Sequence, residues 1–224
     1  MLRNGVFGLL SLALFALPAL GQEYKVEKVA TSAPADELSP EIAAQLQPDG
    51  FKVIKGESRT VCEIWLAKEL PAKADAKLST EILYPLTPGQ FVGVIRYPRK
   101  GADFRDQEIP SGVYTLRYSQ QPVDGAHVGT SLTRDFLALL PAEKDRDPAL
   151  LDYKALTTAS KATTGTAHPG ILSLQKAEDG GEALAIRENP EKEWTLVRFT
   201  AKVKQAGGAK DLPMELVVVG IAAE

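Results

Sequence analysis

The sequence predicts an all-β protein, a single-domain β-sandwich of about eight or nine antiparallel strands with two short helices. Apolar and polar residues alternate in many short segments, and this period of two is typical of strands. Clusters of Pro, Gly, Asn and Asp separate these segments, as turns do. No strand–helix repeat of the kind that builds a parallel sheet is present.

The clearest strand signal covers residues 113–119, directly after the turn formed by Pro110, Ser111 and Gly112. Its two faces differ: Tyr114, Leu116 and Tyr118 on one side, Val113, Thr115 and Arg117 on the other. A second strand is predicted over 136–140. We expect this pair at the centre of the sheet.

The N-terminal residues predict a signal peptide over 1–21. Arg3 precedes an apolar run, 6–17, and the small residues Ala19 and Gly21 fit a cleavage site between Gly21 and Gln22. The run is too short to cross a bilayer of ~30 Å as a helix. Residues 22–38 are polar and predict a flexible leader, which leaves 39–224 as the β-sandwich domain.

Two helix starts are expected. Ser39 followed by Pro40 and Glu41 provides an N-cap, a proline at the first helical position and an acid in the first turn. The second start is predicted at Asp147 and Pro148, with the helix fading over 157–160.

The remaining strands follow from the same periodicity. Hairpins are expected between 51–54 and 60–67 and between 183–187 and 194–203, and 91–97 should lie antiparallel to 113–119. Residues 170–174 form a further strand. The last strand, 214–221, is apolar almost throughout, so we expect it inside the sheet and not at an edge.

Composition excludes some functions. The formal charge of −3 provides no basic surface for nucleic acid or for an anionic membrane. Cys62 is the only cysteine, so no intramolecular disulfide can form. Cys62 lies on the same face of its predicted strand as Ile64 and Leu66, which predicts a buried, inert thiol. A reactive or intermolecular thiol is the alternative.

Three segments together resemble a group of predicted secreted bacterial proteins that are uncharacterised. They are Glu63-Ile64-Trp65-Leu66, the run from Ile109 through Phe136 and Leu137, and the ending 212–220. The resemblance implies export and a β-rich single domain. It implies no activity and no catalytic residue.

The candidate site is the loop between the two central strands, because a long loop without periodicity in a compact domain is usually functional or disordered. Its glycines allow tight turns, and its polar side chains can donate, accept or ligate. The candidate ligand-binding residues are Asp124, His127, Thr130, Ser131, Arg134 and Asp135.

Several interpretations of this loop stay open. A metal site could use His127 with Asp124 or Asp135 and with His168, although the spacing is not diagnostic. A hydrolase could use Ser131, His127 and Asp135, although no nucleophile elbow is present.

We favour a structural loop, in which Arg134 and Asp135 each meet a partner elsewhere and His127 hydrogen-bonds a backbone carbonyl. A small-ligand or glycan contact is a further alternative. Its stacking face would come from Trp65, Tyr97, Tyr114 and Tyr118, a stripe that is more often core.

These patterns predict an exported, soluble, non-catalytic binding or structural module of the bacterial cell envelope, periplasmic or extracellular. The alternative is a metal-dependent or hydrolytic enzyme with its site on residues 120–135. We expect no cofactor, no nucleic acid and no membrane span after cleavage. The expected partner is an envelope protein or a glycan.

Overall fold

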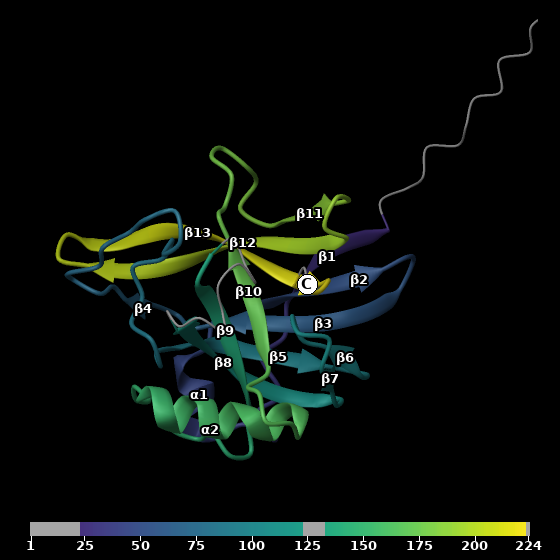
Figure 1. The fold of residues 1–224 in the computed structure, drawn as a ribbon, viewed down its shortest axis with the longest axis horizontal. Coiled ribbons are helices and arrows are strands. Elements are labelled where there is room, and N and C mark those ends of the chain that lie inside the picture. The colour runs from purple at the N-terminus through teal and green to yellow at the C-terminus, as the bar shows by residue number, and fades with distance from the viewer. Residues whose placement is uncertain (1–22, 123–132, 223–224) are drawn as a thin grey trace, which may run out of the picture.

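The computed structural model describes residues 23–122 and 133–222, which form a mainly antiparallel β-structure with two helices (Figure 1). The predicted all-β class is confirmed. The elements in chain order are β1 (Tyr24–Val29), α1 (Pro40–Gln45), β2 (Gly50–Lys55), β3 (Arg59–Leu66), β4 (Leu70–Pro71), β5 (Phe91–Tyr97), β6 (Gly101–Ala102), β7 (Glu108–Ile109), β8 (Gly112–Gln120), β9 (Asp135–Pro141), α2 (Tyr153–Thr164), β10 (Ile171–Gln175), β11 (Ala185–Asn189), β12 (Trp194–Gln205) and β13 (Gly208–Val219).

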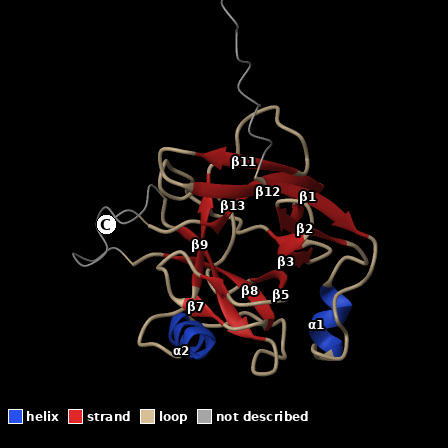
Figure 2. Ribbon diagram, turned by 90° about the vertical axis from the view of Figure 1, so that its right-hand side faces the viewer, coloured by secondary structure: helices blue, strands red, loops and turns tan. Residues whose placement is uncertain are grey.

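Eleven of these strands belong to one curled sheet, more than the eight or nine expected from the sequence. Its order is β1-β2-β3-β5-β8-β9-β10-β13-β12-β11, with β4 parallel to β12, while β6 and β7 pair separately. The first part of β10 pairs with β9 and its last two residues pair with β13, so β10 connects the two halves of the sheet. Figure 2 shows the strands arranged around a common interior.

The predicted strand pairs are confirmed. β8 lies between β5 and β9 in the middle of the strand order, and Leu116 is opposite Leu139. The hairpins β2–β3 and β11–β12 form as expected. β13 lies between β10 and β12, away from the edges, although it begins earlier than predicted, at Gly208.

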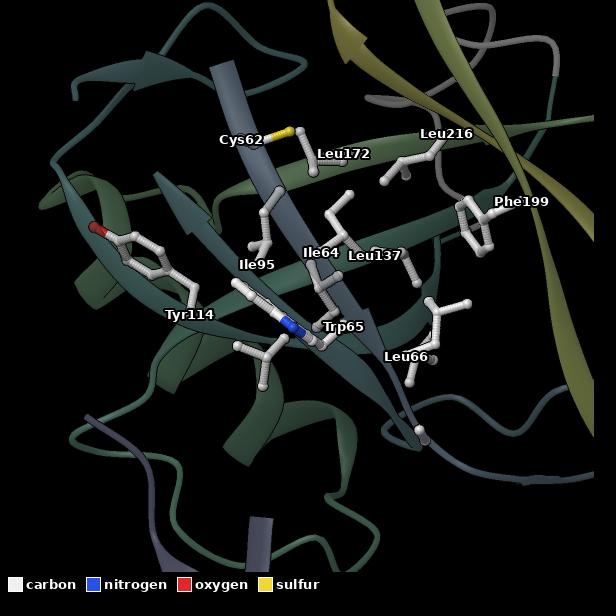
Figure 3. Packing of buried hydrophobic residues seen from close by; sticks show 14 of the residues in the cluster. Cys62, Ile64, Trp65, Leu66, Ile95, Tyr114, Leu137, Leu172, Phe199 and Leu216 are labelled. Carbon is white, nitrogen blue, oxygen red and sulfur yellow. The ribbon is translucent and has the colours of Figure 1, made fainter. Parts of the chain in front are cut away.

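The main core fills the interior of the curled sheet (Figure 3). Phe199 and Leu216, from β12 and β13, face Leu137 and Ile64 from the other half of the sheet. Cys62 is fully buried in this core, and burial raises the pKa of its thiol to about 12. The prediction of a buried thiol is therefore confirmed.

The prediction of a flexible leader over 22–38 is wrong for its described part. β1 pairs with β2 along its whole length, and Tyr24 is buried. The pattern was misleading because Lys25, Glu27 and Lys28 give this strand a polar composition. Glu27 pairs with Lys25 and with Lys52 of β2, as is common on an edge strand.

One of the two predicted helix starts is confirmed and the other is wrong. Ser39 caps α1 by accepting the Ile42 N–H at 3.2 Å, as expected. The predicted start of α2 at Asp147 and Pro148 is wrong, because Asp152 is the N-cap and the helix begins at Tyr153. No described helix is long and apolar enough to cross a bilayer, and the predicted signal peptide, 1–21, lies outside the described residues.

A buried guanidinium lies on the outer face of the central strands. Arg117 of β8 is 0 % exposed and donates from Nε and Nη2 to the Asp145 carboxylate at 2.6 and 2.8 Å. Its Nη1 donates to the carbonyls of Gly89 and Ala149 at 2.9 and 2.7 Å, and Nη2 also donates to the Asp147 carbonyl. Buried charges are tolerated only with such complete pairing.

Replacement of Arg117 should therefore destabilise the fold. We expect Arg117→Met to lower the free energy of unfolding by about 3–5 kcal/mol, because Asp145 is left buried without its partner. Urea denaturation followed by tryptophan fluorescence measures this change. The control, Arg99→Met, removes an exposed arginine and should cost far less.

The double variant Arg117→Met with Asp145→Asn should recover part of the loss, because no unpaired charge remains. If Arg117→Met were as stable as the control, the ion pair would not contribute to stability.

Candidate functional site

Two of the six predicted site residues can be placed. Arg134 and Asp135 lie at the start of β9, whereas Asp124, His127, Thr130 and Ser131 lie outside the described residues. The metal and hydrolytic alternatives both need His127, so they stay predictions. Among the described residues, no three His, Cys, Asp or Glu side chains are grouped as a metal site would require.

Asp135 is buried and hydrogen-bonded within the protein. Its carboxylate accepts the Leu83 N–H and the Tyr118 hydroxyl, and that hydroxyl accepts the Gln120 Nε2–H at 2.8 Å. Burial raises the pKa of Asp135 above its usual value, and these hydrogen bonds oppose the shift only in part.

Arg134 donates from Nε to the Gln121 carbonyl at 2.9 Å. The expectation that Arg134 and Asp135 each meet a partner elsewhere is thus confirmed for both residues.

The predicted stacking face is not available on the surface. Trp65, Tyr97, Tyr114 and Tyr118 are all buried in the main core. Trp65 donates its indole N–H to the Thr31 carbonyl at 2.8 Å. These four aromatic side chains stabilise the interior and cannot stack on a glycan.

A cavity lined by described residues lies elsewhere, between α2 and the outer face of the sheet. It has a volume of about 570 Å³, and we name it the α2 pocket. It is lined by residues of β8, β9, β10 and α2, by Phe104, Arg105 and Asp106 of the β6–β7 loop, by the turn at 167–169 and by residues 221–222.

The floor of the α2 pocket is apolar. Phe104 and Phe136 belong to a second apolar cluster, with ring centroids 6.3 Å apart, and Ile171 packs against it. Ala138 and Leu156 belong to a third cluster under α2. The pocket therefore lies where these two small clusters on the outer face of the sheet are not in contact with each other.

The composition of α2 explains the open space. Only Leu156, Ser160 and Thr163 of this helix are buried. The Ser160 hydroxyl donates to the Gly170 carbonyl at 3.0 Å, and the Thr163 hydroxyl donates to the Leu139 carbonyl at 2.6 Å. Hydrogen bonds from small side chains thus dock the helix, and Leu156 is the one large apolar side chain that α2 buries against the sheet.

The opposite wall is built around Asp103, which is buried. Its Oδ1 accepts the backbone N–H groups of Arg105 and Gln107 at 2.8 and 2.9 Å. Its Oδ2 accepts the Gln107 side-chain amide at 2.8 Å and the Ile171 N–H at 3.0 Å. Four hydrogen bonds to one carboxylate fix the conformation of the loop and its position against β10.

The C-terminal wall is attached to the same loop. The Ala222 N–H donates to the Phe104 carbonyl at 2.9 Å, and the Trp194 indole N–H donates to the Ile221 carbonyl at 2.7 Å. The Ile221 side chain itself remains 47 % exposed beside the pocket. The walls are therefore preformed by the fold, as small-molecule sites usually are.

Charged side chains surround this apolar interior. Arg105, Lys161 and His168 line the pocket and are exposed, and Asp106 is the single acid among the described lining residues. No side-chain hydrogen bond or ion pair joins Arg105 or Lys161 to another part of the described chain. Both cations are thus available to a ligand.

A smaller cavity of about 350 Å³ adjoins Tyr84 and Arg198. An ion-pair cluster lies beside it: Glu215 is buried, accepts two hydrogen bonds from Arg187 and lies 3.7 Å from Arg198. The Tyr84 hydroxyl donates to the Gln175 carbonyl and accepts the Glu215 N–H at 3.2 Å. This arrangement connects β10, β12 and β13 and is structural.

Comparisons of the chain with protein-family models, with curated proteins and with solved structures find no match. Function must therefore be argued from the geometry. The resemblance to secreted bacterial proteins stays a prediction.

Sequence reasoning did not predict the α2 pocket. Of its lining, the candidate loop contains only Gln120, Gln121 and Pro122, and the sequence suggests for His168 a metal ligand or part of a turn before a strand. One signal was present: Phe136, Ala138 and Leu140 make the outward face of β9 as apolar as its inward face. A strand with two apolar faces must be covered on both sides.

The raised pKa of Asp135 predicts a defined pH dependence. The folded state keeps the proton to a higher pH than the unfolded chain, so this residue's contribution to stability falls as pH rises from about 3.9, the ordinary aspartate pKa, through its folded pKa. Asp135→Asn cannot ionise. Its stability relative to the wild type should therefore improve as pH rises, as measured by urea denaturation across that range.

The control, Asp36→Asn, removes the same charge at an exposed position and measures the effect of net charge alone. A difference for Asp135→Asn that is flat, or that moves in the opposite direction, would show that the pKa of this carboxyl is not raised in the folded protein.

Proposed function

We propose that this protein is an exported, non-catalytic binding module of the bacterial cell envelope and that a small apolar ligand occupies the α2 pocket. The observation that carries the proposal is an apolar cavity of about 570 Å³. That volume falls within the range of about 300–1,000 Å³ found for small-molecule sites, which are likewise lined mainly by apolar groups.

The exposed side chains at the pocket support this proposal. Tyr153 and Ile221 are 54 % and 47 % exposed, and they are two of the four large apolar side chains that the described residues leave exposed. Both line the α2 pocket. A bound ligand would remove them from water, and full burial of one such side chain contributes about 1.5–3 kcal/mol.

The scaffold and the location belong to the same proposal. The two halves of the curled sheet face each other across the main core, and we propose that they act as a rigid β-sandwich beneath the pocket. Export to the periplasm or the medium rests on the pattern of residues 1–21. An envelope protein or a glycan stays the predicted partner.

Binding can be tested with a neutral fluorescent apolar probe, N-phenyl-1-naphthylamine, titrated into the purified protein. We expect saturable fluorescence with one site per chain. Thr157→Trp, which adds a large side chain in the pocket wall, should weaken probe binding at least about tenfold, equivalent to 1.4 kcal/mol or more.

Thr158→Trp provides the matched control, because Thr158 is the next residue of α2, is exposed and does not line the pocket. Its probe affinity should equal that of the wild type. Probe binding that does not saturate, or that both variants leave unchanged, would contradict a ligand site at the α2 pocket.

A further inference from the structure

The charge of the pocket is opposite to the charge of the molecule. The whole chain has a formal charge of −3. The described lining of the α2 pocket nevertheless holds Arg105 and Lys161 against a single acid, Asp106. A local cationic site on an acidic protein favours an anion at that position.

The two cations come from different walls. Arg105 lies on the β6–β7 loop and Lys161 in the last turn of α2. Some exposed lysines elsewhere on the described surface form ion pairs, as Lys100 does with Glu108 and Lys202 with Asp211. Arg105 and Lys161 have no such partner in the described part of the chain, so an incoming anion would not have to displace one.

The backbone at Arg105 is held in place before any ligand arrives. Asp103 accepts the Arg105 N–H at 2.8 Å, and the same carboxylate is hydrogen-bonded to Ile171 in the pocket floor. The cation and the apolar floor are therefore connected through one buried residue. Such preorganisation lowers the cost of binding.

We propose that the ligand of the α2 pocket is an amphipathic anion, an apolar body with a carboxylate or a similar acid group, and that Arg105 and Lys161 bind the acid group. This inference rests on the proposed binding function, because it specifies the chemical class of the same ligand. The apolar body packs on Phe104, Phe136 and Ile171. The acid group stays at the exposed cations, where water still reaches it.

The test uses three molecules that share a twelve-carbon chain and differ only in the end group: dodecanoate, dodecanol and dodecylamine. Each competes with N-phenyl-1-naphthylamine for the wild-type protein near pH 8, where an ordinary histidine is neutral. We expect dodecanoate to bind most tightly, dodecanol less tightly and the dodecylammonium cation least. Raised salt should weaken the binding of dodecanoate more than that of dodecanol.

The double variant Arg105→Gln with Lys161→Gln should weaken dodecanoate binding about tenfold and leave dodecanol nearly unchanged, since exposed ion pairs contribute modestly. The matched control is Arg99→Gln with Lys154→Gln. It makes the same change in net charge at exposed residues outside the pocket lining and should not alter either affinity. Circular dichroism checks that both variants are folded.

The outcomes separate this inference from the proposed function. If all three molecules compete equally, or if the double variant binds dodecanoate as the wild type does, the anionic ligand is excluded while the pocket remains a binding site. If neither the probe nor any of the three molecules binds, the proposed function fails and the inference fails with it.

Discussion

The buried guanidinium of Arg117 is the interaction on which the outer layer of this protein depends. Its donors reach Asp145 and the carbonyls of Asp147 and Ala149, so it fixes a segment that has almost no regular structure of its own. Thr115 adds a hydrogen bond to the same carboxylate. Because that segment leads directly into the N-cap of α2, Asp152, a charge buried beside the sheet determines where the helix begins and hence where the pocket wall stands.

A close backbone approach completes this arrangement. Gly89 has φ +90°, and an added Cβ would lie 1.8 Å from the Leu151 carbonyl oxygen. The Leu151 N–H donates to the Gly89 carbonyl at 3.3 Å, and Arg117 donates to that same carbonyl at 2.9 Å. Only glycine combines the left-handed conformation with this contact. Asp103 plays the corresponding part for the opposite wall, so buried charges position both sides of the pocket.

The sequence predicted the inner part of the fold well, because period-two alternation is a local signal. The faces of β8 and β9 and the interior place of β13 follow from it. The prediction failed where a tertiary contact decides the structure. The polar composition of β1 predicts a leader, yet β1 pairs with β2. Asp147 predicts a helix start, yet its carbonyl accepts a hydrogen bond from Arg117. The pocket was beyond sequence reasoning because segments distant in the chain line it.

The outer face of β9 supports the proposal that the pocket is a binding site and not an imperfection of the core. An outward strand position that faces water is normally polar, yet Phe136 and Ala138 are apolar there, as is the neighbouring Ile171 on β10. The helix covers Ala138 through Leu156, and the large apolar side chains of the lining that keep exposed surface are Ile171, in part, and Tyr153 and Ile221. Polar side chains at these positions would solvate the gap at no cost to the inner core. Apolar residues there, between walls fixed by Arg117 and Asp103, support the proposal of an apolar ligand.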